Sequence, residues 1–281
     1  MAISPFFLGP MIAATPLQST VPLVQRAAVG EHPALWVVND SNTIIYLFGT
    51  FHALDGKKLW FDQAVKTAFS ESDELMLETV VPGPQKSSAP ATGKGNPAPE
   101  AAHVVSNGNV IKLAPSASFL ATTKLVMTAG RSKGMSTDRG ADAILRDAAD
   151  QAGIPVRGLE SFEFQLDMFS TLPGGPAKTP PPTDLRTLQA LADVLLHLQA
   201  AWNRGAVEET FAPLLLQMQT QSPQTYRTMF VERNARWANW ISDRMETPGT
   251  IFVAVGAGHL AGPDSVQNQL STLGVKSARI N

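Results

Sequence analysis

The pattern of apolar and polar segments predicts that strands and helices alternate at the start of the chain. Apolar runs with many β-branched and aromatic residues predict strands at 36–39 and 43–48, and the polar residues 39–42 between them predict a hairpin turn. Apolar residues then share one helical face over 60–70, and another apolar run follows at 75–77. Strand, helix and strand in this order form a βαβ unit, which implies parallel strands.

The rest of the chain is mainly helical by pattern and returns to strands at its end. Apolar residues recur at helical spacing in the longer stretches, whereas the strands are short continuous apolar runs. Asp138 is expected to cap the helix after it, Gly153 to end that helix, and Pro263 to begin the last one. The predicted helices cover residues 119–130, 139–151, 188–202, 223–245 and 263–273, and the predicted strands cover residues 155–160, 251–255 and 275–280.

These elements predict a single α/β domain over residues 30–281. Its central sheet is expected to be mixed and partly parallel, with helices on both faces. Residues 182–246 are helical throughout and predict a helical subdomain. Residues 82–100 are rich in proline, alanine, glycine and serine, a composition that predicts a flexible insertion.

Residues 1–25 carry no charge and form a signal-like apolar segment. Four prolines interrupt it, so it is a poor membrane-spanning helix, and no other stretch is long and apolar enough to cross a bilayer. A basic region before it is missing. Export, to the periplasm, is the expectation if the true start lies upstream, and a cytoplasmic location is the alternative.

Composition narrows the classes of function. The 281 residues are 44% hydrophobic and 16% charged, so the chain can bury a core and is not disordered throughout. With 22 basic and 24 acidic residues and no basic block, it does not match a nucleic-acid-binding protein. The absence of cysteine excludes a disulfide scaffold, a thiolate metal site and a cysteine nucleophile.

Two Gly-x-x-His motifs carry the candidate chemistry. Each follows a predicted strand directly, at residues 49–52 and 256–259, and the motifs end in His52 and His259. Ligands of open α/β sheets bind outside the carboxyl ends of the strands, where glycine lets the backbone approach a ligand closely. Glu78 and Glu160 close two other apolar strands, so we expect two imidazoles and two carboxylates to meet in one cleft.

Two kinds of chemistry suit these groups. Imidazole and carboxylate bind zinc, manganese, iron or cobalt, and such an ion would polarise a carbonyl group and lower the pKa of a bound water. Without a metal, the same groups can act as general base and acid. Arg233 lies in the middle of the apolar stripe of its helix, so it should face a carboxylate, either Glu78 or Glu160, or bind a substrate carboxylate.

Each of these assignments has a structural alternative. The histidines can be hydrogen-bonded loop residues, because function is common in loops but not general there. Glu78 and Glu160 can be solvated charges at strand ends. Arg233 can extend past the aromatic residues of its helix to reach water.

At these residues the sequence resembles the TraB/GumN family, also called TraB/PrgY/GumN. The resemblance runs from about Ala34 to the C-terminus, and the paired Gly-x-x-His motifs are its most specific part. It implies a relation to the Tiki metalloproteases, which need a divalent metal such as manganese or cobalt. Carried over by position, the residues associated with activity are His52, His259 and Glu78, with Arg233 in support. The matching segments are residues 35–36, 47–52, 75–78, 158–160, 232–234 and 252–260.

From the residues and the resemblance together we expect a metal-dependent hydrolase, a peptidase of the Tiki type, acting on a peptide or protein. His52, His259 and Glu78 would hold the metal, manganese or cobalt. Glu78, Arg233 and Glu160 would take part in catalysis, with Arg233 fixing a carboxylate. Two alternatives stay open: a non-catalytic binding or signalling module for a peptide or polysaccharide, and a metal-free hydrolase similar to an esterase.

Overall fold

The computed structural model describes residues 32–61, 63–80, 103–106, 109–112, 119–172 and 184–281. In this part of the chain six strands form one sheet in the order β6-β3-β7-β2-β1-β8. Strands β6, β3, β7 and β2 are parallel, and β1 is antiparallel to both of its neighbours. The mixed, partly parallel sheet predicted from the sequence is therefore confirmed. The strands are β1 (Leu35–Asn39), β2 (Thr43–Thr50), β3 (Glu74–Thr79), β6 (Val156–Glu160), β7 (Gly249–Gly256) and β8 (Ala278–Arg279).

The first hairpin and the first βαβ unit form as predicted, with one difference. The carboxylate of Asp40 accepts the backbone N–H groups of Asn42 and Thr43, which closes the turn between β1 and β2. Strands β2 and β3 are parallel, but β7 lies between them and pairs with both. A strand from the far end of the chain thus occupies the centre of the sheet, and sequence order alone does not indicate this.

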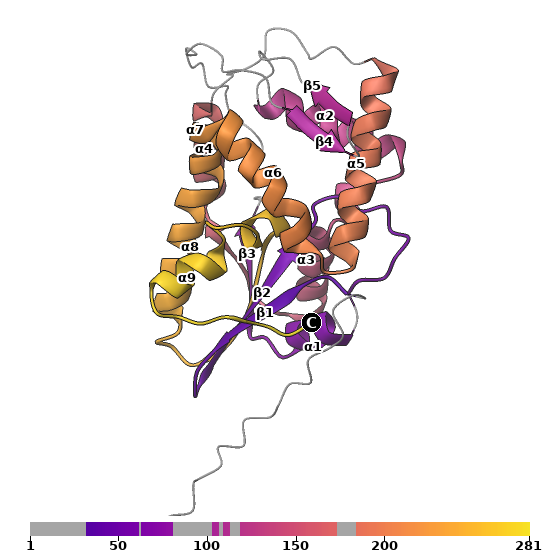
Figure 1. Cartoon of the computed structure of the whole chain (residues 1–281). Coiled ribbons are helices and arrows are strands. Elements are labelled where there is room, and N and C mark those ends of the chain that lie inside the picture. Colours follow the sequence, from indigo (N-terminus) through magenta and orange to yellow (C-terminus); the bar gives the residue numbers. More distant parts are fainter. Residues whose placement is uncertain (1–31, 62, 81–102, 107–108, 113–118, 173–183) are drawn as a thin grey trace, which may run out of the picture.

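Helices cover both faces of the sheet (Figure 1), with α8 and α9 on one side and α1 and α3 on the other. Helix α5 packs against α2, and α6 packs against the short helix η3 that follows β7. A π-helical turn, η2, joins α7 to α8. The helices are α1 (Gln63–Ser70), α2 (Phe119–Ser132), η1 (Thr137–Arg139), α3 (Ala141–Ala152), α4 (Phe162–Thr171), α5 (Leu185–Asn203), α6 (Val207–Gln221), α7 (Pro223–Tyr226), η2 (Arg227–Val231), α8 (Glu232–Arg244), η3 (Ala257–Leu260) and α9 (Val266–Thr272), and the strands β4 (His103–Ser106) and β5 (Asn109–Lys112) form a separate pair.

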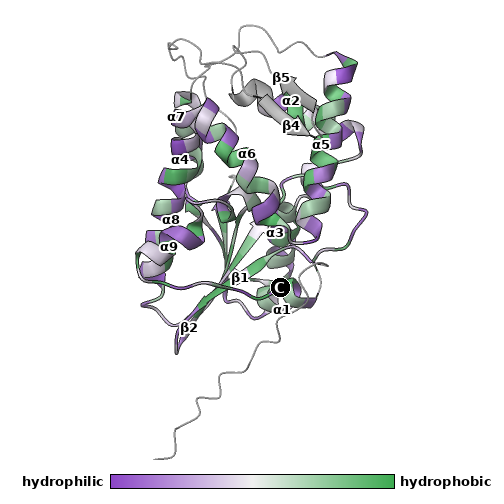
Figure 2. Ribbon diagram, in the orientation of Figure 1, coloured by the Kyte–Doolittle hydropathy of each residue, from purple (hydrophilic) through white to green (hydrophobic). Residues whose placement is uncertain are grey.

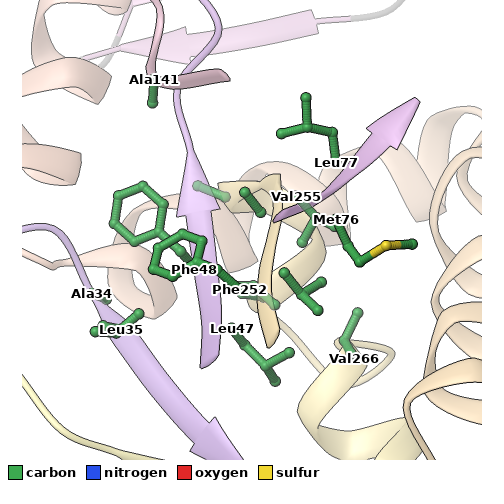
Figure 3. Packing of buried hydrophobic residues seen from close by; sticks show 14 of the residues in the cluster. Ala34, Leu35, Leu47, Phe48, Met76, Leu77, Ala141, Phe252, Val255 and Val266 are labelled. Atoms are coloured by element: carbon green, nitrogen blue, oxygen red, sulfur yellow. The ribbon is translucent and has the colours of Figure 1, made fainter. Parts of the chain in front are cut away.

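The hydrophobic core surrounds the central strands. Strand β7 is almost continuously apolar because helices cover both of its faces, and its last six residues are buried. The strands are accordingly hydrophobic along most of their length, whereas the helices carry one hydrophobic and one hydrophilic side (Figure 2). Phe48 of β2 packs against Phe252 of β7, with ring centroids 5.8 Å apart (Figure 3). This packing holds the ends of β2 and β7 in a fixed relation.

Several predicted boundaries are wrong for local reasons. Asp138 is not the cap of the helix after it: Ser136 caps the short helix η1, and α3 begins only at Ala141. Pro263 does not begin the last helix, because the Ser265 side chain accepts the N–H of Asn268 and α9 starts after it. The first helix begins at residue 63 rather than 60, and the last strand is limited to residues 278–279. Gly153 ends α3 as predicted, with φ of 68°.

The remaining predictions on organisation are only partly covered. Residues 1–25 and 82–100, predicted as a signal-like segment and an insertion, lie outside the described residues. The described part of 182–246 is helical, and its helices also contact η3 and α9, while the subdomain stays a prediction. Among the residues that the structure covers, no helix combines the length and apolar character needed to cross a membrane.

Candidate active site at the carboxyl edge of the sheet

Four parallel strands end at the same edge of the sheet. Thr50 of β2 is paired with Gly256 of β7, and Thr79 of β3 with Glu160 of β6. The two Gly-x-x-His motifs therefore leave the sheet side by side, and Glu78 and Glu160 stand on the two neighbouring strands. The structure thus brings together the four side chains that the sequence placed at strand ends.

Arg233 lies at the centre of this group and comes from helix α8. Its side chain is only 2% exposed. The Nη2 atom is 2.7 Å from Glu78 Oε2, and Nε donates to both carboxylate oxygens of Glu160, at 3.1 and 3.0 Å. Burial alone would lower the pKa of the guanidinium, but the two carboxylates raise it above its ordinary value. Arg233 is therefore a fixed positive charge, and it pairs with both glutamates that the sequence proposed as alternatives.

Glu160 forms ion pairs with two arginines, Arg233 and Arg236. Its side chain is 4% exposed and, besides Arg233, contacts Arg236 Nη2 at 3.1 Å and Gln165 Nε2 at 3.5 Å. Both carboxylate oxygens are therefore used to hold arginine side chains. This geometry fits a role in positioning Arg233 and leaves Glu160 little capacity to act on a substrate itself.

Glu78 has one oxygen bound to Arg233 and the other directed toward β7. Its Oε1 accepts the backbone N–H of Gly256 at 2.7 Å. Burial alone would raise the pKa of Glu78, but Arg233, protonated His52 and the Gly256 N–H hold it well below its ordinary value. Glu78 is therefore a carboxylate throughout the neutral range.

His259 is a buried, neutral imidazole. It lies in η3, between the rings of Phe230 and Trp237, whose centroids are 4.8 and 4.5 Å from its own. Its Nδ1 is 2.6 Å from Asn234 Oδ1, and its Nε2 is 3.3 Å from Arg233 Nη1. Burial lowers the pKa of His259 to about 3, so the ring stays neutral.

His52 differs from His259 in exposure and charge. Its side chain is 62% exposed, and its Nδ1 is 2.7 Å from Asp142 Oδ2. Thr50 donates to the other oxygen of Asp142 at 2.8 Å, which fixes that carboxylate. Asp142 raises the pKa of His52 to about 9. His52 is thus an oriented imidazole whose Nε2 is directed toward β7.

Gly256 leaves the space that these side chains share. A Cβ atom on it would lie 3.1 Å from Glu78 Oε1, 3.2 Å from His52 Nε2 and 3.6 Å from His259 Cδ2. Its φ of −52° and ψ of 136° are open to any residue, so the backbone conformation does not require glycine. What favours glycine is the close approach of His52 and Glu78, because a Cβ atom would meet both at less than ordinary van der Waals distance.

The donor set fits a metal ion bound by both histidines poorly. No group of three or more His, Asp or Glu side chains within the described ranges is arranged to hold a metal ion. The Nε2 lone pair of His259 faces the Arg233 guanidinium, which also contacts Glu78. The buried positive charge of Arg233 is in direct contact with His259 and Glu78, two of the expected ligands, and it would repel a metal cation bound by them. The side chains of the site are therefore the groups available for chemistry there.

Sequence reasoning missed the residues that orient the histidines and the second arginine. Asp142 lies in α3, 90 residues from His52, and no local pattern connects the two. Asn234 follows Arg233 directly in the buried stripe of α8, so a second polar residue in an apolar stripe was the available signal. Arg236 is one helical turn beyond Arg233, and its charge gave no sign that it would share Glu160.

The raised pKa of His52 leads to a prediction about pH. Because Asp142 stabilises protonated His52 in the folded state, its contribution to stability is complete below pH 6.5 and is lost as the pH rises through about 9. We expect Asp142→Asn to return the pKa of His52 toward its ordinary value. NMR titration of His52 in both proteins measures this, and an unchanged pKa in Asp142→Asn would contradict the pairing.

Comparison with known proteins agrees with the motifs at this edge of the sheet. The sequence model of the TraB/PrgY/gumN family matches residues 34–279, a range that contains every strand and side chain of the candidate site. No curated protein and no solved structure gives a significant match. The chain belongs to the TraB/PrgY/gumN family.

Proposed function

We propose that this chain is a hydrolase that activates a water molecule in the space beside Gly256. The observation that carries the proposal is that His52 Nε2 and Glu78 Oε1 both lie close to the Gly256 backbone, 3.2 and 3.1 Å from the position that a Cβ atom on Gly256 would take. A water that lies just outside the Gly256 backbone can therefore contact both polar atoms, and Nε2 accepts from it when His52 is neutral. The exposed face of His52 gives a substrate access to that water.

The side chains divide the work of such a reaction. Because Asp142 raises the pKa of His52 to about 9, the base is the neutral form of His52, whose share grows as the pH rises toward that value. This form accepts a proton from the water through Nε2, while Asp142 orients the ring and stabilises the imidazolium that forms. Glu78 stays ionised and directs the water. Arg233, bound to Glu78 at 2.7 Å, keeps that carboxylate ionised and fixes its orientation toward the water. Protonated His52 then returns its proton to the leaving group.

A peptide or an ester is the substrate class that suits this chemistry. Attack of an activated water on an acyl carbon requires a base and a group that orients the water, which are the roles assigned above to His52 and Glu78. The resemblance of the two Gly-x-x-His motifs to those of the Tiki metalloproteases favours a peptide or protein substrate.

A metal-dependent peptidase is the second candidate, and two distances favour it. Glu78 Oε1 and His259 Nε2 are 3.7 Å apart, close to the spacing of two ligands of one ion. His52 Nδ1 is 2.7 Å from a carboxylate oxygen of Asp142, and metal-binding histidines commonly have such a carboxylate partner. Manganese or cobalt would then be the cofactor. This candidate requires Arg233 to leave His259, because the guanidinium contacts the nitrogen that would bind the metal.

Metal removal distinguishes the two candidates. We expect purified protein to hydrolyse members of a peptide and ester panel equally well before and after treatment with EDTA. Loss of activity in EDTA and its return with manganese or cobalt would favour the metal-dependent peptidase. Binding of a peptide or a polysaccharide without turnover would favour a non-catalytic module.

The same assay tests the role of His52. We expect His52→Ala to lower activity by about a hundredfold or more, because general-base catalysis contributes roughly 10²–10⁴ in rate. His197→Ala is the matched control, since His197 is an exposed histidine of α5. Equal activity of His52→Ala and the control would contradict the proposal.

A further inference from the structure

Asn234 connects the candidate site to the backbone of the loop before α9. It is fully buried in α8, next to Arg233. Its Nδ2 donates to the carbonyl oxygen of Asp264 at 2.7 Å, and its Oδ1 lies 2.6 Å from His259 Nδ1. Each end of the amide thus has one short contact.

These contacts determine which group donates in each hydrogen bond of the series that runs from Asp264 through Asn234 and His259 to Arg233. A backbone carbonyl can only accept, so the amide nitrogen of Asn234 must face Asp264 and the amide oxygen must face His259. The oxygen can only accept, so His259 Nδ1 must carry the proton. Nε2 is then an acceptor, and Arg233 Nη1 donates to it at 3.3 Å.

The nearest other partner of His259 is Glu78 Oε1, which is 3.7 Å from Nε2 and therefore beyond hydrogen-bond distance. The rings of Phe230 and Trp237 cover the imidazole, and the residue is 5% exposed, so water does not replace a lost hydrogen bond. If Nε2 carried the proton instead, two donors would face each other at 3.3 Å. The guanidinium would then be pushed away from His259 and would lose its alignment with Glu78.

We propose that Asn234 is a positioning residue: it holds His259 in the Nδ1-protonated tautomer, and His259 in turn directs Arg233 toward Glu78. The functional consequence rests on the proposed hydrolase. The structural part, the tautomer of His259, does not depend on catalysis and can be measured without a substrate.

The variant Asn234→Asp keeps the shape of the side chain and reverses its hydrogen bonding at one end. A carboxylate accepts from His259 but cannot donate to the Asp264 carbonyl, and it favours a doubly protonated imidazole. Asn234→Leu removes both hydrogen bonds and leaves Nδ1 without an acceptor. The exposed Asn239 of the same helix provides the control, Asn239→Leu.

Nitrogen NMR of protein labelled in its five histidines tests the proposal at one neutral pH. His259→Gln identifies the signals of His259. The expected result is a protonated Nδ1 and an unprotonated Nε2 in the unmodified protein and in Asn239→Leu, and a different protonation pattern in Asn234→Asp and Asn234→Leu. A protonated Nε2 in the unmodified protein, or an unchanged pattern in both Asn234 variants, would overturn the proposal.

Kinetic measurements test the functional part of the proposal. Both Asn234 variants are expected to lower kcat by about ten- to a hundredfold with little change in KM, the size of effect seen for residues that orient a functional histidine. A folded Asn234 variant with altered NMR signals and unchanged kcat would overturn the functional part. If the unmodified protein shows no turnover on any substrate, the proposed function fails, while the NMR result still decides the role of Asn234.

Discussion

Replacing Arg233 with methionine is expected to lower the free energy of unfolding by about 3–5 kcal/mol. Methionine retains most of the volume but leaves Glu78 without its cation, and Glu160 with Arg236 alone. Both carboxylates are nearly buried, at 15% and 4% exposure, so water cannot replace the lost partner. Denaturant unfolding measures the change.

An exposed ion pair of the neighbouring segment provides the control. Arg227 binds Glu232 at 2.9 Å, but the two side chains are 74% and 44% exposed. Arg227→Met should therefore cost no more than about 1 kcal/mol. A similar cost for both variants would show that Arg233 does not neutralise buried charge. Adding Glu160→Gln to Arg233→Met should recover part of the stability, because the uncompensated charge is then removed.

Replacing Gly256 with alanine is expected to abolish hydrolysis while the protein stays folded. The new methyl group would lie 3.2 Å from His52 Nε2 and 3.1 Å from Glu78 Oε1, and it would displace the water proposed to bridge them. The backbone angles accept alanine, and the atoms that it meets are the ends of side chains that can move by a few tenths of an ångström. We expect a loss of at least about a hundredfold, since displacing reacting groups by about 1 Å has effects of this size.

Gly130→Ala is the control for adding a methyl group at a tight position. Gly130 lies in α2, and a Cβ atom there would be 3.3 Å from Leu195, with no side chain of the candidate site nearby. This variant should retain full activity. Thermal unfolding of both variants separates loss of function from loss of fold. Full activity of Gly256→Ala would place the reaction elsewhere in the molecule.

The sequence was sufficient to predict the frame of the site. Apolar runs indicate strands. A residue that directly follows such a run lies at the carboxyl edge of a parallel sheet, whichever strands are the neighbours of that strand. The sequence pattern therefore assigns His52, Glu78, Glu160 and His259 to one edge of the sheet. Arg233 was identified for a related reason, because an arginine within an apolar helical stripe must find an opposite charge.

Helix boundaries were less predictable, because several neighbouring residues can each act as the N-cap of a helix. Ser136 and Ser265 took positions assigned to Asp138 and Pro263, and the choice depends on backbone angles that composition does not determine. The placement of β7 between β2 and β3 was also beyond local pattern, since strand order follows from how whole elements pack.

The sequence by itself determined the α/β class, the edge at which the polar residues gather and five members of the polar group: His52, Glu78, Glu160, Arg233 and His259. Only the tertiary structure decided what each member does. Asp142, which lies in α3, raises the pKa of the exposed His52, whereas burial in the fold keeps His259 neutral and places its Nδ1 2.6 Å from Asn234 of α8. The physical reason is that periodicity acts over a few residues, whereas the charge and tautomer of a side chain depend on the burial and partners that the whole fold provides.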